Sequence, residues 1–149
     1  MMRVENYSEN YFLDIVRLVE KFYQEHLQEI YGKIERKIIF ETINKFSGEN
    51  SKNAFLLIVE GSCVGLLAGV EVKSELNSEK FFQEILWYIE KPYGQNFRYL
   101  IKKAQIMLQS RGFSIIIMAV MENSKSSKIE GIYKRIGFDK LETHYMRKL

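Results

Sequence analysis

The chain has 149 residues, of which 46% are hydrophobic and 28% are charged, and it contains one proline. This composition excludes collagen-like, low-complexity and charge-driven disordered proteins, and the length predicts a single domain over residues 1–149. The lone cysteine, Cys63, excludes an intrachain disulfide, and the net charge of +3 is too small to predict a nucleic-acid partner. Because no stretch is apolar enough for a membrane span, we expect a soluble, cytoplasmic protein without membrane contacts.

The first third of the chain predicts one strand and two helices. A short strand is expected near residues 3–6, and Ser8 is a candidate N-cap for a helix over residues 9–27. The apolar residues of that helix recur at three- and four-residue spacing, which is typical of an amphipathic helix. A second helix is expected over residues 34–46, where a Ser-Gly pair ends it.

The middle of the chain predicts a sheet. Residues 54–59 are continuously apolar, residues 64–72 are the expected hairpin partner, and residues 81–90 are a third strand rich in aromatic and β-branched side chains. A helix over residues 97–111 and an apolar strand over residues 114–120 follow. A strand, a helix and another strand joined by short connections predict a parallel βαβ unit.

A helix ending near residue 136 and a last strand over residues 141–146 complete the predicted order β-α-α-β-β-β-α-β-α-β. This order predicts an α/β fold with a mixed sheet. Serine-hydrolase, phosphate-loop and dinucleotide-binding motifs are absent from the sequence. The remaining candidate site is the turn between the third strand and its helix, because the first amides of a helix can bind a phosphate.

Residues 132–138, Ile-Tyr-Lys-Arg-Ile-Gly-Phe, contain a Tyr-x-x-x-Gly-Phe pattern near the end of the chain. With the βα turn and the apolar strand before it, this pattern resembles the GNAT superfamily of N-acetyltransferases across essentially the whole chain. The stretch Glu84 to Ile89 also looks like the fourth strand of a phage-type subgroup. The resemblance implies the GNAT fold, acetyl-CoA as co-substrate and a primary amine as acceptor.

The coenzyme-binding motif of that family is degenerate in this sequence. Family members carry Arg/Gln-x-x-Gly-x-Gly/Ala at the turn, and the aligned positions here are Pro92, Gln95 and Phe97, so neither glycine is kept. A shifted loop would still turn its amides inward, with Phe97 packed in the core beside Ile101 and Ala104. The resemblance then places the coenzyme contacts at Gly94, Gln95, Asn96, Phe97 and Arg98.

The resemblance implies further cofactor-binding residues at the end of the third strand and after the apolar strand over residues 114–120. Tyr88 and Ile89 end the third strand of the group, and the resemblance places the Ile89 amide near the thioester carbonyl. Asn123 and Ser127 lie in the loop and helix start after the apolar strand. Asn123 precedes Tyr133 by ten residues rather than the seven usual in the family, which implies a longer loop.

The resemblance also assigns two catalytic roles. Tyr133 matches the family's general acid, which would protonate the departing thiolate. Glu84 is the candidate base, directly or through water. Strand alternation predicts that Glu84, Leu86 and Tyr88 share one face, where Phe82 and Leu86 would partly desolvate the carboxylate and raise its pKa.

Two other functions remain open from the sequence. The missing glycines favour a GNAT-fold module that has lost catalysis and binds a protein or ligand, and helix residues Lys102, Lys103 and Arg111 offer a weaker nucleic-acid surface. In this family the acceptor pocket usually forms from the first two helices, here residues 23–38, whose mixed charges select no acceptor. The sequence also leaves a homodimer open.

Overall fold

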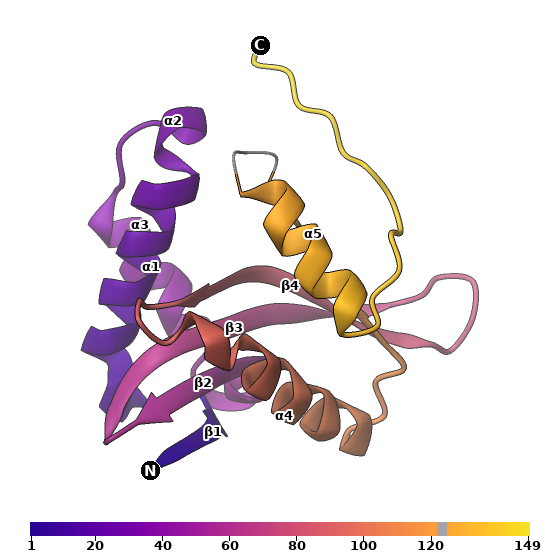
Figure 1. The fold of residues 1–149 in the computed structure, drawn as a ribbon, viewed down its shortest axis with the longest axis horizontal. Helices are drawn as coiled ribbons and strands as arrows, with labels where there is room; N and C mark the ends of the chain where they lie inside the picture. The colour runs from indigo at the N-terminus through magenta and orange to yellow at the C-terminus, as the bar shows by residue number, and fades with distance from the viewer. Residues whose placement is uncertain (122–124) are drawn as a thin grey trace. The chain divides into compact units, whose positions relative to one another are not determined.

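The computed structural model describes residues 1–121 and 125–149, which form two compact units, Met1–Ala119 and Val120–Leu149. The first unit contains a five-stranded sheet of order β1-β2-β3-β4-β5 (Figure 1). All neighbouring strands are antiparallel except β4 and β5, which are parallel. This arrangement confirms the predicted mixed α/β sheet with its βαβ unit. The strands are β1 (Met2–Asn6), β2 (Ala54–Val59), β3 (Ser62–Lys73), β4 (Lys80–Ile89) and β5 (Ile115–Ile117).

Helices cover both faces of this sheet (Figure 1). One face packs against α1 and α3, and its core joins Ile15 and Leu18 of α1 to Leu56, Leu66 and Leu86 of the strands. The predicted Ser8 cap is present, since its hydroxyl accepts a hydrogen bond from the Asn10 amide. The helices of this unit are the 3-10 turns η1 (Glu9–Tyr11), η2 (Gly48–Asn53) and η3 (Gly94–Asn96), with α1 (Phe12–His26), α2 (Gln28–Tyr31), α3 (Arg36–Asn44) and α4 (Phe97–Ser110).

The opposite face of the sheet packs against α4. Phe82 of β4 is fully buried there, with its ring 5.8 Å from that of Phe55 and 6.3 Å from that of Phe113. Apolar residues of α4, among them Leu100 and Leu108, are buried at helical spacing. This packing fixes where α4 begins, which is the position that matters for the candidate site.

A β-bulge interrupts β4 at Ile85. Ala68 of β3 pairs with Leu86, whereas the next residue, Gly69, pairs with Glu84, so Ile85 has no partner across the ladder. Gly69 permits the close packing at this point, because a Cβ there would lie 2.5 Å from both the Gln83 carbonyl oxygen and the Phe82 ring. The bulge therefore changes the side-chain alternation of β4 halfway along the strand.

The second unit, residues 120–149, contains α5 (Ser126–Arg135). The strand predicted over residues 141–146 is wrong, since residues 138–149 adopt no regular secondary structure. Its side chains are exposed, and a strand gains stability only when its backbone pairs with a neighbour, which a local alternating pattern cannot supply. None of the described helices combines the length and hydrophobicity needed to cross a membrane.

Candidate active site

The parallel strands β4 and β5 separate partway along their length. They pair only between residues Phe81–Gln83 and Ile115–Ile117, while β4 continues to Ile89. The apolar run after Ile117, predicted as strand to residue 120, therefore leaves the ladder early. Residues 84–89 of β4, which we call the β4 edge, lie beyond the ladder with β5 and begin beside the bulge at Ile85. Strand edges of this kind can bind an extended ligand by hydrogen bonds.

Glu84 lies where the two strands separate. Its Oε2 accepts a hydrogen bond of 2.9 Å from the backbone amide of Ala119, so the carboxylate takes the place of a ladder acceptor. Burial raises the pKa of Glu84 to about 7, and the hydrogen bond from Ala119 opposes this rise. The raised pKa agrees with the sequence prediction and suits a general base near neutral pH.

The predicted face of Glu84 is wrong. Because Ile85 forms a bulge, Glu84 shares the α4 face with Phe82 and Trp87, whereas Leu86 and Tyr88 belong to the α1 face. Simple alternation assumes one residue per ladder position, and the extra residue reverses the faces beyond it. Leu86 therefore does not flank the carboxylate on its own face.

The turn after β4 leads directly into α4. The Tyr93 amide donates to the Glu90 carbonyl at 2.8 Å, and the Asn96 amide donates to the Tyr93 carbonyl at 2.9 Å. Asn96 is the N-cap of α4, and no described side chain caps the helix. The Phe97 amide donates to the Gly94 carbonyl because η3 runs directly into α4. The next amides, those of Arg98 and Tyr99, are therefore the candidates for binding an anion, since the first amides of an α-helix have no i→i−4 acceptor. Gly94 is exposed, and a Cβ there would meet no atom within 4 Å.

These features fit a phosphate-bearing ligand. The positive end of the α4 dipole, uncapped amides and the exposed Arg98 side chain all favour an anion at this turn. The β4 edge leads to the same turn, so an extended ligand with a terminal diphosphate has complementary groups along its length. The sequence-predicted contacts Gly94, Gln95, Asn96 and Arg98 all lie on this turn.

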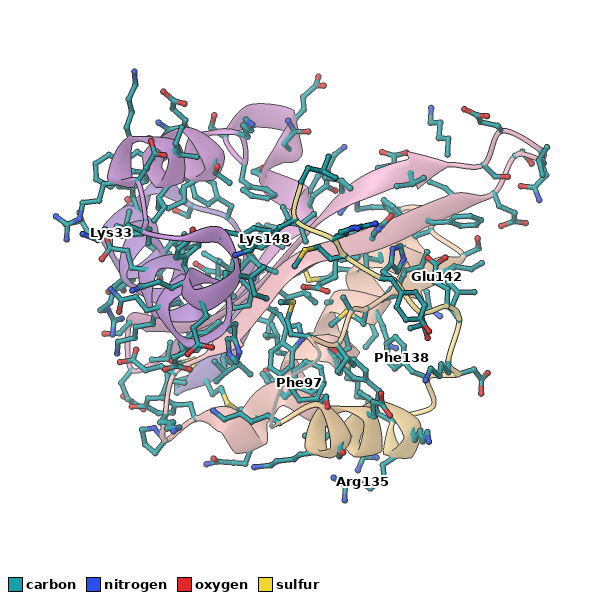
Figure 2. All side chains as sticks on the ribbon, turned by 90° about the horizontal axis from the view of Figure 1, so that it is seen from above. Lys33, Phe97, Arg135, Phe138, Glu142 and Lys148 are labelled. Carbon is teal, nitrogen blue, oxygen red and sulfur yellow. The ribbon has the colours of Figure 1, made fainter. Side chains whose placement is uncertain are left out.

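Phe97, the first residue of α4, packs into the core as predicted (Figure 2). Its side chain is 4% exposed, and its ring lies 4.3 Å from that of Trp87, with an interplanar angle of 33°. Ile101 and Ala104 are buried on the same helix. The Phe97 ring therefore stabilises the start of α4.

We expect Phe97→Gly to lower the free energy of unfolding by about 3–4 kcal/mol, because a buried ring is lost and glycine disfavours the helix. Affinity for acetyl-CoA should not improve. Chemical denaturation and calorimetric titration measure the two effects, and Phe97→Leu, which keeps an apolar side chain, should lose less stability. Tighter coenzyme binding by Phe97→Gly would show instead that the ring obstructs the turn.

A row of charged residues on α1 binds the end of β4 and the start of β3. Arg17 and Lys21 both contact the Glu90 carboxylate, at 2.5 and 2.8 Å. Asp14 accepts hydrogen bonds from Arg17 and from the Cys63 amide. These contacts hold the strand end from which the turn begins.

The same row ends at Glu25, which accepts a hydrogen bond of 2.8 Å from the Tyr88 hydroxyl. Burial, followed by the contact with Glu25, raises the pKa of Tyr88. The sequence prediction named Tyr88 as a coenzyme contact and included Glu25 only within the acceptor segment 23–38, so their contact was missed. The signal available was spacing, since Asp14, Arg17, Lys21 and Glu25 recur at three- and four-residue intervals.

The remaining predicted residues belong to the second unit. Tyr133 of α5 is buried, and its ring lies 5.6 Å from that of Phe138. Ser127 is exposed on the same helix, and Asn123 lies outside the described residues. The roles of these three residues at the site stay predictions. Over residues 1–121 and 125–149, no group of three or more histidine, cysteine or acidic residues could hold a metal ion.

No family model and no curated protein sequence matches this chain. Solved structures match over its whole length. An aminoglycoside acetyltransferase from an uncultured soil metagenomic sample has a TM-score of 0.75 at 16% identity, covering 100% of this chain and 99% of that one. An aminoglycoside N-acetyltransferase in complex with CoA has a TM-score of 0.74 at 10% identity, with 100% and 95% covered.

A third similar structure is a GNAT family acetyltransferase from Staphylococcus aureus. Its TM-score is 0.69 at 10% identity, and the match covers 99% of this chain and 98% of that one. At these identities the likeness establishes the fold. The chain has the fold of the GNAT acetyltransferases, as its sequence predicts.

Proposed function

We propose that this chain is an N-acetyltransferase that transfers an acetyl group from acetyl-CoA to a primary amine. The observation that carries the proposal is the β4 edge, which opens beside a carboxylate of raised pKa and leads to an uncapped helix N-terminus. The acetyltransferase fold supports it, because one similar structure holds CoA. The backbone groups of the β4 edge that point away from β3 would bind the extended arm of the coenzyme, and the α4 turn would bind its diphosphate.

In the proposed reaction, the amine nitrogen attacks the thioester carbonyl carbon, forming a C–N bond as the C–S bond breaks. Glu84 accepts the proton that the amine loses, through a water molecule. Backbone amides at the end of β4, including that of Ile89, stabilise the oxyanion. The family resemblance assigns the general acid to Tyr133, whose phenol would donate a proton to the departing thiolate.

We expect acetyl-CoA to stabilise the folded chain. Ligand that binds only the native state adds about 2.7 kcal/mol at a hundredfold excess over its dissociation constant, which raises the melting temperature of a chain of this size by roughly 5–10 °C. Thermal unfolding and calorimetric titration measure this effect. If millimolar acetyl-CoA neither raises the melting temperature nor produces heat in the titration, the proposal is wrong. A binding module without catalysis would then be favoured.

Two charge-reversal variants on α4 test whether the diphosphate binds at the turn before this helix. Arg98→Glu puts a negative charge beside the proposed site and should weaken acetyl-CoA binding by on the order of tenfold. Lys102→Glu makes the same change of charge about one turn further along the helix and should weaken it less. Equal effects of both variants would indicate general charge attraction rather than a site at the turn.

For the acceptor we propose a chemical class, primary amines, rather than one compound. Two of the similar structures are aminoglycoside acetyltransferases, so amino sugars belong in the first screen. Polyamines, amino acids and peptides complete it, with release of the CoA thiol as the measured product. If the chain binds the coenzyme but acetylates none of these amines, it is an acyl-CoA-binding protein, and the proposed acetyl transfer to these amines is wrong.

A further inference from the structure

We propose that Glu25 selects acceptors that carry a second ammonium group, so that the preferred substrate class is polycationic amines. The inference rests on the proposed acetyl transfer. In it, one amine of the acceptor attacks the acetyl group at the β4 edge. A second amine of the same molecule, protonated, binds the Glu25 carboxylate.

Tyr88 fixes Glu25 next to the β4 edge. The Tyr88 hydroxyl donates to Glu25 Oε1 at 2.8 Å, and Tyr88 is itself only 8% exposed, so its orientation is set by packing. The Glu25 side chain remains 40% exposed. One carboxylate oxygen is therefore held by the sheet while the group as a whole stays accessible to a ligand.

Glu25 differs in its charge balance from Asp14 of the same row and from Glu90, which the row contacts. Glu90 lies between Arg17 and Lys21, and Asp14 contacts Arg17. Among the described residues no lysine or arginine forms an ion pair with Glu25, and His26 Nε2, which lies 3.8 Å from its Oε2, is charged only when protonated. An accessible carboxylate with so little compensation attracts a cation.

Acetyl-CoA and the amine acceptor would approach from opposite faces of the sheet. Trp87 stacks on Phe97 on the α4 face, where the coenzyme would bind at the helix start. The acceptor would then reach the carbonyl from the α1 face, which carries Tyr88 and Glu25. The water that passes its proton to Glu84 on the other face would lie where β4 and β5 separate. An amine bound to Glu25 is an ammonium ion and has no free electron pair. The nucleophile must therefore be a second, neutral amine.

Matched acceptors test the inference. Hexylamine and 1,6-diaminohexane have the same carbon chain, and only the second carries another ammonium group. For the wild type we expect kcat/KM to be higher for the diamine. Glu25→Gln should reduce kcat/KM for the diamine by about 10- to 100-fold, mainly through KM, because a charge-assisted hydrogen bond is lost. The value for hexylamine should change little.

Control variants separate the contact from general charge effects. Glu41→Gln removes an exposed carboxylate from α3 and should leave the preference for the diamine unchanged. Tyr88→Phe keeps the ring but releases Glu25, and it should reduce the preference in the same direction by a smaller factor. Equal losses on both amines in Glu25→Gln, or no loss on either, would overturn the inference.

Equilibrium binding distinguishes failure of this inference from failure of the proposed function. Calorimetry with CoA present measures diamine binding without turnover. If the diamine binds the wild type more tightly than Glu25→Gln while no acetyl transfer occurs, the cation site stands and the proposed function falls. If acetyl transfer occurs but diamine affinity is independent of Glu25, the proposed function stands and the cation site falls.

Discussion

Glu84→Gln is expected to reduce kcat/KM for acetyl transfer by about 10²- to 10⁴-fold, the usual contribution of a general base. Glutamine has nearly the same shape, and its amide oxygen can still accept the hydrogen bond from Ala119. The variant therefore removes the proton acceptor while it keeps the strand separation. Glu79→Gln, an exposed carboxylate in the loop before β4, is the matched control and should leave the rate unchanged.

The pH profile provides a sharper measure of the same prediction. The ratio of wild-type to Glu84→Gln kcat/KM cancels the ionisation of the acceptor amine, because both enzymes use the same acceptor. Burial places the pKa of Glu84 at about 7, so this ratio should rise as the pH passes through 7 and remain constant above it. A ratio independent of pH would show that Glu84 only holds the strands apart.

Stability gives an independent check on that pKa. The folded pKa of about 7 lies above the value of about 4.3 for an unfolded glutamate. Folding therefore takes up a proton between these two values, and the stability present below pH 4 is lost as the pH rises through 7. Glu84→Gln should be more stable than the wild type above pH 7, and this advantage should vanish in acid. Denaturant unfolding across this range measures the difference.

Tyr133→Phe should lower turnover by about 10²- to 10⁴-fold while acetyl-CoA affinity changes little. The variant keeps the ring, and with it the contact with Phe138 at 5.6 Å, and removes only the hydroxyl that would protonate the thiolate. Tyr145→Phe makes the same chemical change at an exposed position of the same unit and should have no effect. Wild-type turnover in Tyr133→Phe would make Tyr133 a packing residue, with water as the proton donor.

Local sequence patterns predict most of the fold. Continuous apolar runs and helical spacing define β2, β3, β4 and α4 to within a few residues, because burial and backbone geometry act locally there. The short helix α2 was missed, since four residues carry too little periodicity. The strand expected over residues 141–146 was also wrong. Whether such a segment pairs depends on a partner edge that its own sequence does not encode.

The site was predictable where it depends on one segment. The turn before α4, the buried Phe97 and the raised pKa of Glu84 follow from residues close together in the chain. The bulge at Ile85 does not, because it depends on the register between β3 and β4. The contact between Glu25 and Tyr88 was missed for the same reason, since it joins residues 63 positions apart.

On the proposed acceptor side, side-chain contacts hold α1 to the strands, whereas the segment that follows α1 is held less firmly. Up to Glu25 the helix is tied to the strands through Cys63, Tyr88 and Glu90. Beyond it, α2 contains no buried residue, and the turn that follows is held locally by the Tyr23 hydroxyl on the Gly32 carbonyl. Substitutions in α2 therefore replace no buried residue, so the proposed acceptor preference could change there without loss of the fold.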